Sequence, residues 1–309
     1  MARCIFLAAV IGPAMMLLAG CDAMIDHDAR KIIEPASMPA KLVQQTLYKD
    51  SELLARGRIT LHESLAVWDG TRIDYWVIRH RRSVPTAGSP GTARGSVVLI
   101  HPLLTSKHWF LPLGEILADS GFDVVLIDLR AHGQSGGQYV TWGAKEKRDI
   151  KSVMDNLVAR GVVSDRIYAC GASLGGCVAI QYAAIEPRCR GVLSICPPAG
   201  ASEVAGLILP LHRGPGLQAR IGRAAAIAGF DVADASAVSA AAKLNCSLLL
   251  AHGYWDFIVP YSHSEAIFNA AAQPKKLIPC KWSSHMTIQV YQDQWIAQQI
   301  EDLVMMGQG

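Results

Sequence analysis

The pattern that most constrains this fold is an alternation that begins near residue 97. Short apolar runs, four to six residues long, alternate with longer stretches of helical periodicity. Continuous apolar strands are typical of parallel strands that helices cover on both faces. The pattern therefore predicts a doubly wound α/β sheet. The predicted strands are 97–100, 124–127, the run from Ile167, 191–196, 247–251 and 276–281, and the predicted helices are 109–119, 145–160, 173–184, 262–272 and 286–305.

Composition agrees with one large α/β domain. The chain has 309 residues, of which 51% are hydrophobic and 18% charged, so it can bury a full core. Its net charge is only +3 and no basic block stands out, which argues against a nucleic-acid partner. Extended runs at 58–63 and 72–80 predict a hairpin at one sheet edge. Residues 81–96 read as an exposed loop.

Residues 197–245 interrupt the alternation. They contain no strand-like run, and an alanine-rich stretch lies near their middle. We expect a small helical cap over the carboxyl ends of the strands, where open α/β sheets bind ligands. Such a cap either contacts an acyl chain or simply packs, and the sequence leaves both open.

A nucleophile candidate lies between a predicted strand and a predicted helix. The apolar run that starts at Ile167 ends in Gly171-Ala172-Ser173-Leu174-Gly175 and passes directly into helix. A sharp turn of this kind holds a serine hydroxyl above the sheet. Side chains at the two glycine positions would collide where strand and helix close together. The alternative interpretation is an ordinary glycine-rich turn.

A base and an orienting carboxylate follow in the order that this chemistry needs. Asp256 comes a few residues after the strand 247–251, and His285 comes just after the strand 276–281. A serine hydroxyl needs a base to take its proton, and that base needs an orienting acid. Ser173, Asp256 and His285 therefore form the predicted catalytic triad. Otherwise Asp256 is a solvated turn residue and His285 caps a helix.

The developing oxyanion needs two backbone N–H donors. The N–H of Leu174 heads the helix after the nucleophile, where the helix dipole also helps. The second donor should come from the loop His101-Pro102-Leu103-Leu104, and we assign Leu103, with Leu104 as the alternative.

These motifs resemble the α/β-hydrolase superfamily. His101-Pro102-Leu103 is similar to its His-Gly oxyanion loop, and Asp128-Leu129-Arg130-Ala131-His132-Gly133 is similar to its Asp-x-Arg-Gly-His-Gly signature. The resemblance covers about residues 58–305 and looks nearest to the serine aminopeptidase and monoglyceride-lipase-like branch. It implies a mostly parallel eight-stranded sheet with helices on both faces and a small cap. It also gives Asp128, Arg130 and His132 a structural role.

Two departures from the family pattern affect single positions. Pro102 stands where the family has glycine, and its fixed φ can tilt the oxyanion loop. Ala131 replaces a glycine in a structural turn.

The expected activity is a serine hydrolase that cleaves carboxylic esters, or thioester or amide bonds, through an acyl-enzyme. The alternatives are a catalytically silent envelope binding protein, and an acyltransferase or cofactor-free haloperoxidase-like enzyme. No cofactor is expected, and the cysteine spacing matches no zinc pattern. The six cysteines from Cys170 to Cys280 read mostly as buried thiols, although disulfides stay possible. The expected partner is a small ester or acyl substrate, and oligomeric state is open.

The N-terminus reads as an export signal. Arg3 precedes an apolar run over 5–18 that is short for a membrane span. Leu18-Ala19-Gly20-Cys21 resembles the bacterial lipobox, which implies a lipid anchor at Cys21 in the cell envelope. Asp22 resembles the signal for the inner membrane, so a Gram-negative source implies its periplasmic face. An ordinary secretory signal cleaved nearby, or an uncleaved anchor, is the alternative. The predicted organisation is a signal peptide over 1–20, a tether with a helix near 39–47 over 21–50, and a domain over 51–309.

Overall fold

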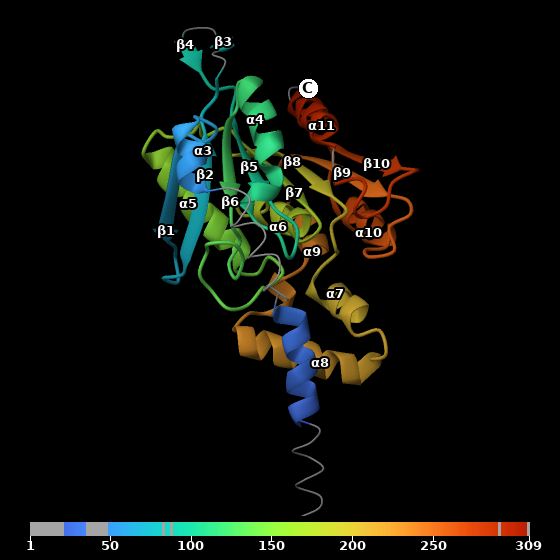
Figure 1. Ribbon diagram of the computed structural model, residues 1–309. Coiled ribbons are helices and arrows are strands. Elements are labelled where there is room, and N and C mark those ends of the chain that lie inside the picture. Colours follow the sequence, from blue (N-terminus) through green and yellow to red (C-terminus); the bar gives the residue numbers. More distant parts are fainter. Residues whose placement is uncertain (1–21, 35–48, 82–83, 87–88, 290–291, 308–309) are drawn as a thin grey trace, which may run out of the picture.

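The computed structural model describes residues 22–34, 49–81, 84–86, 89–289 and 292–307. Its centre is one eight-stranded sheet in the order β1-β2-β6-β5-β7-β8-β9-β10 (Figure 1). The pairs β1–β2 and β2–β6 are antiparallel and the other pairs are parallel. This confirms the predicted mostly parallel sheet with a hairpin at one edge. The strands are β1 (Leu61–Ala66), β2 (Arg72–Ile78), β5 (Ser96–Ile100), β6 (Asp123–Ile127), β7 (Ile167–Ala172), β8 (Cys189–Ile195), β9 (Ser247–Gly253) and β10 (Lys275–Cys280).

Two hydrophobic clusters, one on each face of the sheet, explain why the strands are apolar throughout. Along β5, Val97 and Leu99 belong to one cluster, whereas Val98 and Ile100 belong to the other. Successive side chains of a strand point to opposite faces, so a sheet covered on both sides needs apolar residues at every position. On one face lie α3 (Asp50–Ala55), η1 (Lys107–Phe110), α4 (Leu111–Asp119) and α11 (Asp293–Met306); on the other lie α5 (Glu146–Ala159), α6 (Leu174–Ala183), α9 (Ala237–Ala241) and α10 (Ser262–Ala270).

The insertion between β8 and β9 is helical. It contains α7 (Ala201–Ile208), α8 (Gly214–Ala228), η2 (Val232–Asp234) and α9. The helices α7 and α8 lie at the carboxyl end of the parallel strands (Figure 1). We call α7, α8 and the turn between them the cap.

The expected tether is partly a helix, which corrects the prediction for this region. Residues 22–33 are helical, and Ala29, Ile32 and Ile33 pack with cap residues in a separate apolar cluster. The indole Nε1 of Trp142 donates to the carbonyl oxygen of Ile32 at 2.9 Å. These apolar positions follow the i, i+3, i+4 spacing of a helix face, a signal that could have been read in the sequence.

Other boundaries also differ from the predictions. The loop predicted at 81–96 includes a two-stranded hairpin, β3 (Val84–Thr86) with β4 (Ser89–Thr92). The final helix begins at Asp293 rather than near 286, because residues 286–289 form a turn that supports His285. The helix predicted at 39–47 lies outside the described residues, as does Cys21. Within the described part of the chain, no helix is both long enough and apolar enough to span a membrane.

Candidate active site

Ser173 lies on a strained turn between β7 and α6. Its φ is +52°, a conformation that costs a non-glycine residue free energy and persists only where its surroundings enforce it. A Cβ on Gly171 would lie 2.1 Å from the carbonyl oxygen of Gly175, and a Cβ on Gly175 would lie 2.0 Å from that of Ile100. Both glycines are therefore required for strand, turn and helix to pack this closely, as the sequence predicted.

The structure brings Ser173, His285 and Asp256 together. The Nε2 atom of His285 is 3.0 Å from the hydroxyl oxygen of Ser173, and its Nδ1 is 2.6 Å from Oδ2 of Asp256. A proton on Nδ1 donates to the carboxylate, which leaves Nε2 free to accept from Ser173. His285 and Asp256 are buried, whereas Ser173 is partly exposed. This is the geometry of a nucleophile, a base and an orienting acid.

Backbone contacts hold the His285 loop against the loop that carries Asp256. The N–H of Trp255 donates to the carbonyl oxygen of Ser283 at 3.1 Å. A Cβ on Gly253 would lie 2.6 Å from that same oxygen, so only glycine permits this approach. The side chain of Gln289 donates to the carbonyl oxygen of His285 at 2.7 Å. The contacts to Asp256, Trp255 and Gln289 thus hold His285 and its loop in place.

The Asp256 carboxylate is kept ionised by its hydrogen bonds. Its Oδ1 accepts the N–H groups of Ile258 at 2.9 Å and Val259 at 2.7 Å. Burial acts to raise the pKa of Asp256, but hydrogen bonds from His252, His285 and Val259 outweigh burial and hold that pKa well below its usual value. A permanently charged acid can stabilise the imidazolium that forms when His285 takes a proton.

A second histidine, which the sequence analysis did not single out, contacts the same carboxylate. Nε2 of His252 is 2.9 Å from the carbonyl oxygen of Val259 and 3.2 Å from Oδ2 of Asp256. Because that carbonyl can only accept, Nε2 carries the proton, and Nδ1 faces the hydroxyl of Ser264 at 2.6 Å. His252 lies four residues before Asp256 at the end of β9, but nothing in the sequence shows that its ring turns toward the carboxylate.

Both predicted oxyanion donors lie beside the nucleophile. Leu174 is the first residue of α6, so its N–H has no intrahelical partner. Leu103 follows β5 and lines the same cavity as Ser173, while Leu104 has a φ of +65°. The loop turns at Leu104, whose backbone is in the left-handed region, two residues after Pro102.

The buried ring of His101 braces the oxyanion loop. Its Nε2 accepts the N–H of Leu129 at 3.0 Å, and its Nδ1 donates to the carbonyl oxygen of Pro102 at 2.8 Å. Burial lowers the pKa of His101 to about 3, so the ring stays neutral and keeps both bonds. The loop is therefore tied to the end of the neighbouring strand β6.

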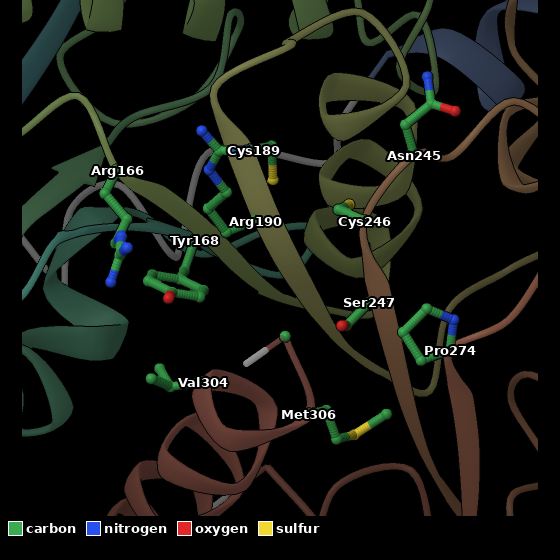
Figure 2. A pocket seen from close by; sticks show the side chains of 11 residues that line it. Arg166, Tyr168, Cys189, Arg190, Asn245, Cys246, Ser247, Pro274, Val304 and Met306 are labelled. Carbon is green, nitrogen blue, oxygen red and sulfur yellow. The ribbon is translucent and has the colours of Figure 1, made fainter. Parts of the chain in front are cut away.

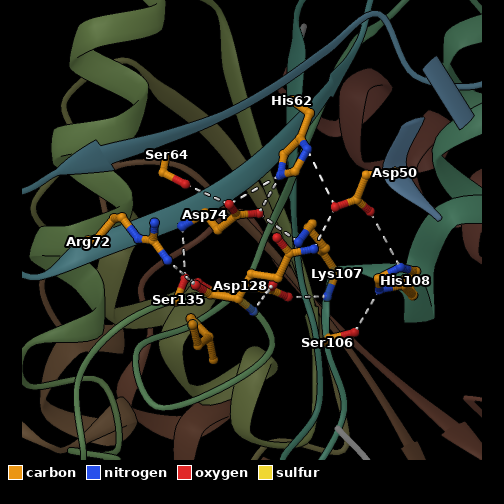
Figure 3. A network of polar contacts seen from close by, with 12 residues as sticks. Asp50, His62, Ser64, Arg72, Asp74, Ser106, Lys107, His108, Asp128 and Ser135 are labelled. Carbon is orange, nitrogen blue, oxygen red and sulfur yellow. Dashed lines mark hydrogen bonds and ion pairs between the residues drawn. The ribbon is translucent and has the colours of Figure 1, made fainter. Parts of the chain in front are cut away.

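A buried charged network includes Lys107, three residues after this loop (Figure 3). The Lys107 ammonium is fully buried, 2.7 Å from Oδ1 of Asp74 and 2.7 Å from Oδ2 of Asp128. Asp128 also accepts the N–H groups of Lys107 at 2.7 Å and Gln134 at 2.8 Å. His62 adds a contact to Asp74 at 3.0 Å. Burial acts to lower the pKa of Lys107, but the two carboxylates outweigh it and raise that pKa.

Asp128, Arg130 and His132 contact elements around the turn that carries them. Arg130 makes two hydrogen bonds to Asp149, at 2.7 and 2.6 Å, and the His132 ring packs 5.0 Å from the ring of His101. Ala131 has a φ of +62°, which shows why glycine would suit that turn.

An apolar cavity of about 330 Å³ opens at Ser173. Its walls come from the oxyanion loop, the cap helix α7 and the segment after Asp256. The lining residues are Leu103, Trp142, Ser173, Pro198, Val204, Leu207, Ile208, Phe257, Ile258 and Val259. A second cavity of about 310 Å³ lies at the amino ends of β7, β8 and β9, the opposite end of these strands from Ser173. Its lining includes Cys189 and Cys246 (Figure 2).

Metal-ligating atoms gather at one place in the described residues. Those of Cys196, Asp256 and His285 lie within 4.8 Å of one another. The 2.6 Å hydrogen bond between His285 and Asp256 already uses two of these three groups. Six cysteines are free thiols in the described chain: Cys170, Cys177, Cys189 and Cys196 are buried, and Cys246 and Cys280 are partly buried.

Comparisons with known proteins agree with this architecture. Residues 91–213 match the family model described as serine aminopeptidase, S33. The uncharacterized protein YfhR of Escherichia coli K12 is 27% identical over 216 residues, which are 68% of this chain and 68% of the relative. The uncharacterized protein YqkD of Bacillus subtilis is 24% identical over 210 residues, 64% of this chain and 67% of the relative.

Among solved structures, the Pyrococcus furiosus esterase Pf2001 superposes with a TM-score of 0.61 at 20% identity, covering 81% of this chain and 94% of the esterase. An esterase from Exiguobacterium antarcticum superposes with a TM-score of 0.57 at 16% identity, covering 78% of this chain and 98% of the esterase. The sheet order, the turn at Ser173 and these superpositions agree: this chain has the α/β-hydrolase fold.

Proposed function

We propose that the protein is a serine hydrolase that cleaves carboxylic esters of apolar acids. The observation that carries the proposal is the continuous hydrogen-bonded path from Ser173 through His285 to Asp256, which opens into an apolar cavity. Each link is within hydrogen-bond distance, and the carboxylate at its end is held ionised.

In the proposed reaction, the hydroxyl oxygen of Ser173 attacks the ester carbonyl carbon while Nε2 of His285 takes the hydroxyl proton. The negative charge on the carbonyl oxygen is stabilised by the N–H groups of Leu174 and Leu103. His285 then donates the proton to the departing alcohol, and the acyl group remains on Ser173. Water, activated by the same histidine, attacks the acyl-enzyme and releases the acid.

The apolar lining of the cavity supports an acyl chain as the occupant. Val204, Leu207 and Ile208 of α7 form one wall, and Phe257 and Ile258 form another. An apolar chain gains free energy in proportion to the surface it buries there. A carboxylic ester is therefore favoured over a peptide, whose polar backbone would lack partners against these walls.

A fluorophosphonate probe tests the nucleophile. Wild-type protein should be labelled and Ser173→Ala should not, with circular dichroism establishing that both are folded. Absence of Ser173-dependent labelling in folded protein would instead favour a silent binding protein.

A series of p-nitrophenyl esters tests the acyl pocket. We expect kcat/KM to rise from acetyl to medium-length chains. Leu207→Trp, which fills part of the cavity, should remove that rise while sparing the acetyl ester. A strong preference for acetyl in the wild type would contradict an acyl-binding cap.

A further inference from the structure

Large apolar side chains are exposed in the segments that follow the carboxyl ends of the parallel strands, and three of them also line the cavity. They come from four separate segments at the carboxyl edge of the sheet: the oxyanion loop, the cap, and the loops after β9 and β10. We call this set the apolar rim, and it consists of Leu104, Leu207, Leu211, Phe257, Ile258 and Trp282.

The rim is too exposed to be explained by packing within this chain. Leu211, Phe257 and Trp282 are 94%, 85% and 91% exposed. An aromatic side chain of this size presents about 150–250 Å² when uncovered, so Phe257 and Trp282 each expose a large apolar area at this end of the strands. Because Phe257 and Leu207 also line the cavity, this surface is continuous with the site.

Charge around the rim favours an anionic partner surface. Within 103–105, 207–213, 254–261 and 281–286, all of which the structure describes, Asp256 is the one carboxylate, and it is buried; the exposed Glu203 lies four residues before Leu207 on α7. Arg213 and Lys281 flank the rim and are exposed. Apolar side chains bordered by cations are typical of proteins that lie on the interface of an anionic bilayer.

The chain also enters the described structure at this end of the molecule. The helix over 22–33 begins one residue after Cys21, the predicted lipid attachment point, and packs against the cap (Figure 1). Arg220 of α8 bonds Asp28 of this helix at 2.8 Å, and Arg223 pairs with Asp26. The helix is thus fixed to the cap, so a lipid on Cys21 would bring the cap side toward a membrane.

We propose that the apolar rim docks on a phospholipid bilayer containing anionic lipid, with the cavity mouth facing the acyl chains. Ester substrates then enter Ser173's cavity from the lipid phase rather than from water. Substrate entry rests on the proposed hydrolase function, whereas docking itself does not.

Fluorescence quenching tests docking without turnover. Full-length Ser173→Ala protein is reconstituted with vesicles of phosphatidylcholine and phosphatidylglycerol whose acyl chains are brominated. We expect strong tryptophan quenching, and the added change Trp282→Phe should remove a large part of it. Vesicle-bound protein in which Trp282 contributes no quenching would overturn the proposal.

A kinetic ratio tests substrate entry. Full-length Leu211→Ser/Trp282→Ser should hydrolyse a vesicle-embedded long-chain ester at least about tenfold more slowly than wild type, because each lost side chain removes apolar burial in the bilayer. Hydrolysis of soluble p-nitrophenyl acetate should stay within about twofold, since neither residue lines the cavity. The control Met305→Ser, at a 66% exposed side chain on α11, should change neither rate.

Other outcomes separate the two proposals. If Trp282 is quenched but the wild type hydrolyses no ester, the hydrolase function fails and docking stands. Equal loss on both esters would overturn a docking role. Concentration-dependent dimerisation of the wild type that Leu211→Ser/Trp282→Ser abolishes, without quenching of Trp282, would make the rim a contact between two copies of the chain.

Discussion

Replacing Lys107 by methionine should destabilise the protein far more than an ordinary lysine substitution. Methionine keeps the apolar stem and similar volume, but it removes the one ammonium that lies 2.7 Å from each of two buried carboxylates, Asp74 and Asp128. Removing one partner of a buried ion pair costs about 3–5 kcal/mol, because the remaining charge is left uncompensated. For a chain of 309 residues that corresponds to a melting temperature lower by about 5–8 °C.

The pH dependence of this loss identifies its cause. Burial acts to raise the pKa of Asp128, but the charge and hydrogen bonds of Lys107 outweigh burial and lower that pKa. The contribution of Asp128 to stability is therefore present above its unfolded pKa and is lost as pH falls through its folded pKa. Without Lys107, the two facing carboxylates repel and one takes up a proton in the folded state. The free-energy difference between Lys107→Met and wild type should therefore shrink as pH falls from 8 to 5, by up to about 1.4 kcal/mol per pH unit.

Urea unfolding followed by fluorescence, at several pH values, measures both quantities. The matched control is Lys276→Met, at an exposed lysine on the edge strand β10, and it should cost less than about 1 kcal/mol. A loss below 1 kcal/mol for Lys107→Met, or a loss that does not vary with pH, would refute the argument. The proposed esterase activity should fall as well, because Lys107 lies three residues after Leu104 of the oxyanion loop.

Three further predictions concern the candidate site. Gly175→Ala should give little folded protein or at least about a hundredfold lower kcat/KM, since its Cβ would lie 2.0 Å from the backbone oxygen of Ile100; near-normal kinetics in folded protein would contradict the packing argument. Asp256→Asn should keep the fold but lower kcat by about 10⁴, because an amide can hold His285 in the wrong tautomer; kinetics on a p-nitrophenyl ester measure this, and a loss below tenfold would exclude the orienting role. His101 has a folded pKa of about 3, below its ordinary value of 6.5, so the unfolded state binds more protons between these values and stability falls as pH falls from 6.5 toward 3. His101→Gln should flatten this dependence by about 1.4 kcal/mol per pH unit in urea unfolding, and an unchanged slope would show that the folded ring takes up a proton at the same pH as the unfolded one.

Much of the fold could be predicted because its signals are local. A strand buried on both faces must be apolar at each position, so runs such as Val97–Ile100 are visible without knowing their neighbours. The turn at Ser173 needs small residues two positions before and after it, and that spacing is visible in the sequence too. The strands β3 and β4 were missed because the loop around them is rich in glycine and proline. The helix at 22–33 was missed because its mixed polar composition was considered instead of the helical spacing of its apolar residues.

What the sequence by itself determined is the order of strands and helices, the strained turn, and the positions of a serine, an aspartate and a histidine at strand ends. Only the tertiary structure decided which distant side chains meet. It turns His252 toward Asp256, buries Lys107 between two carboxylates, fixes the helix over 22–33 to the cap, and leaves Phe257 and Trp282 exposed. The physical reason is that burial, charge pairing and exposure depend on contacts between residues far apart in the chain, whereas strand, helix and turn formation depends chiefly on near neighbours.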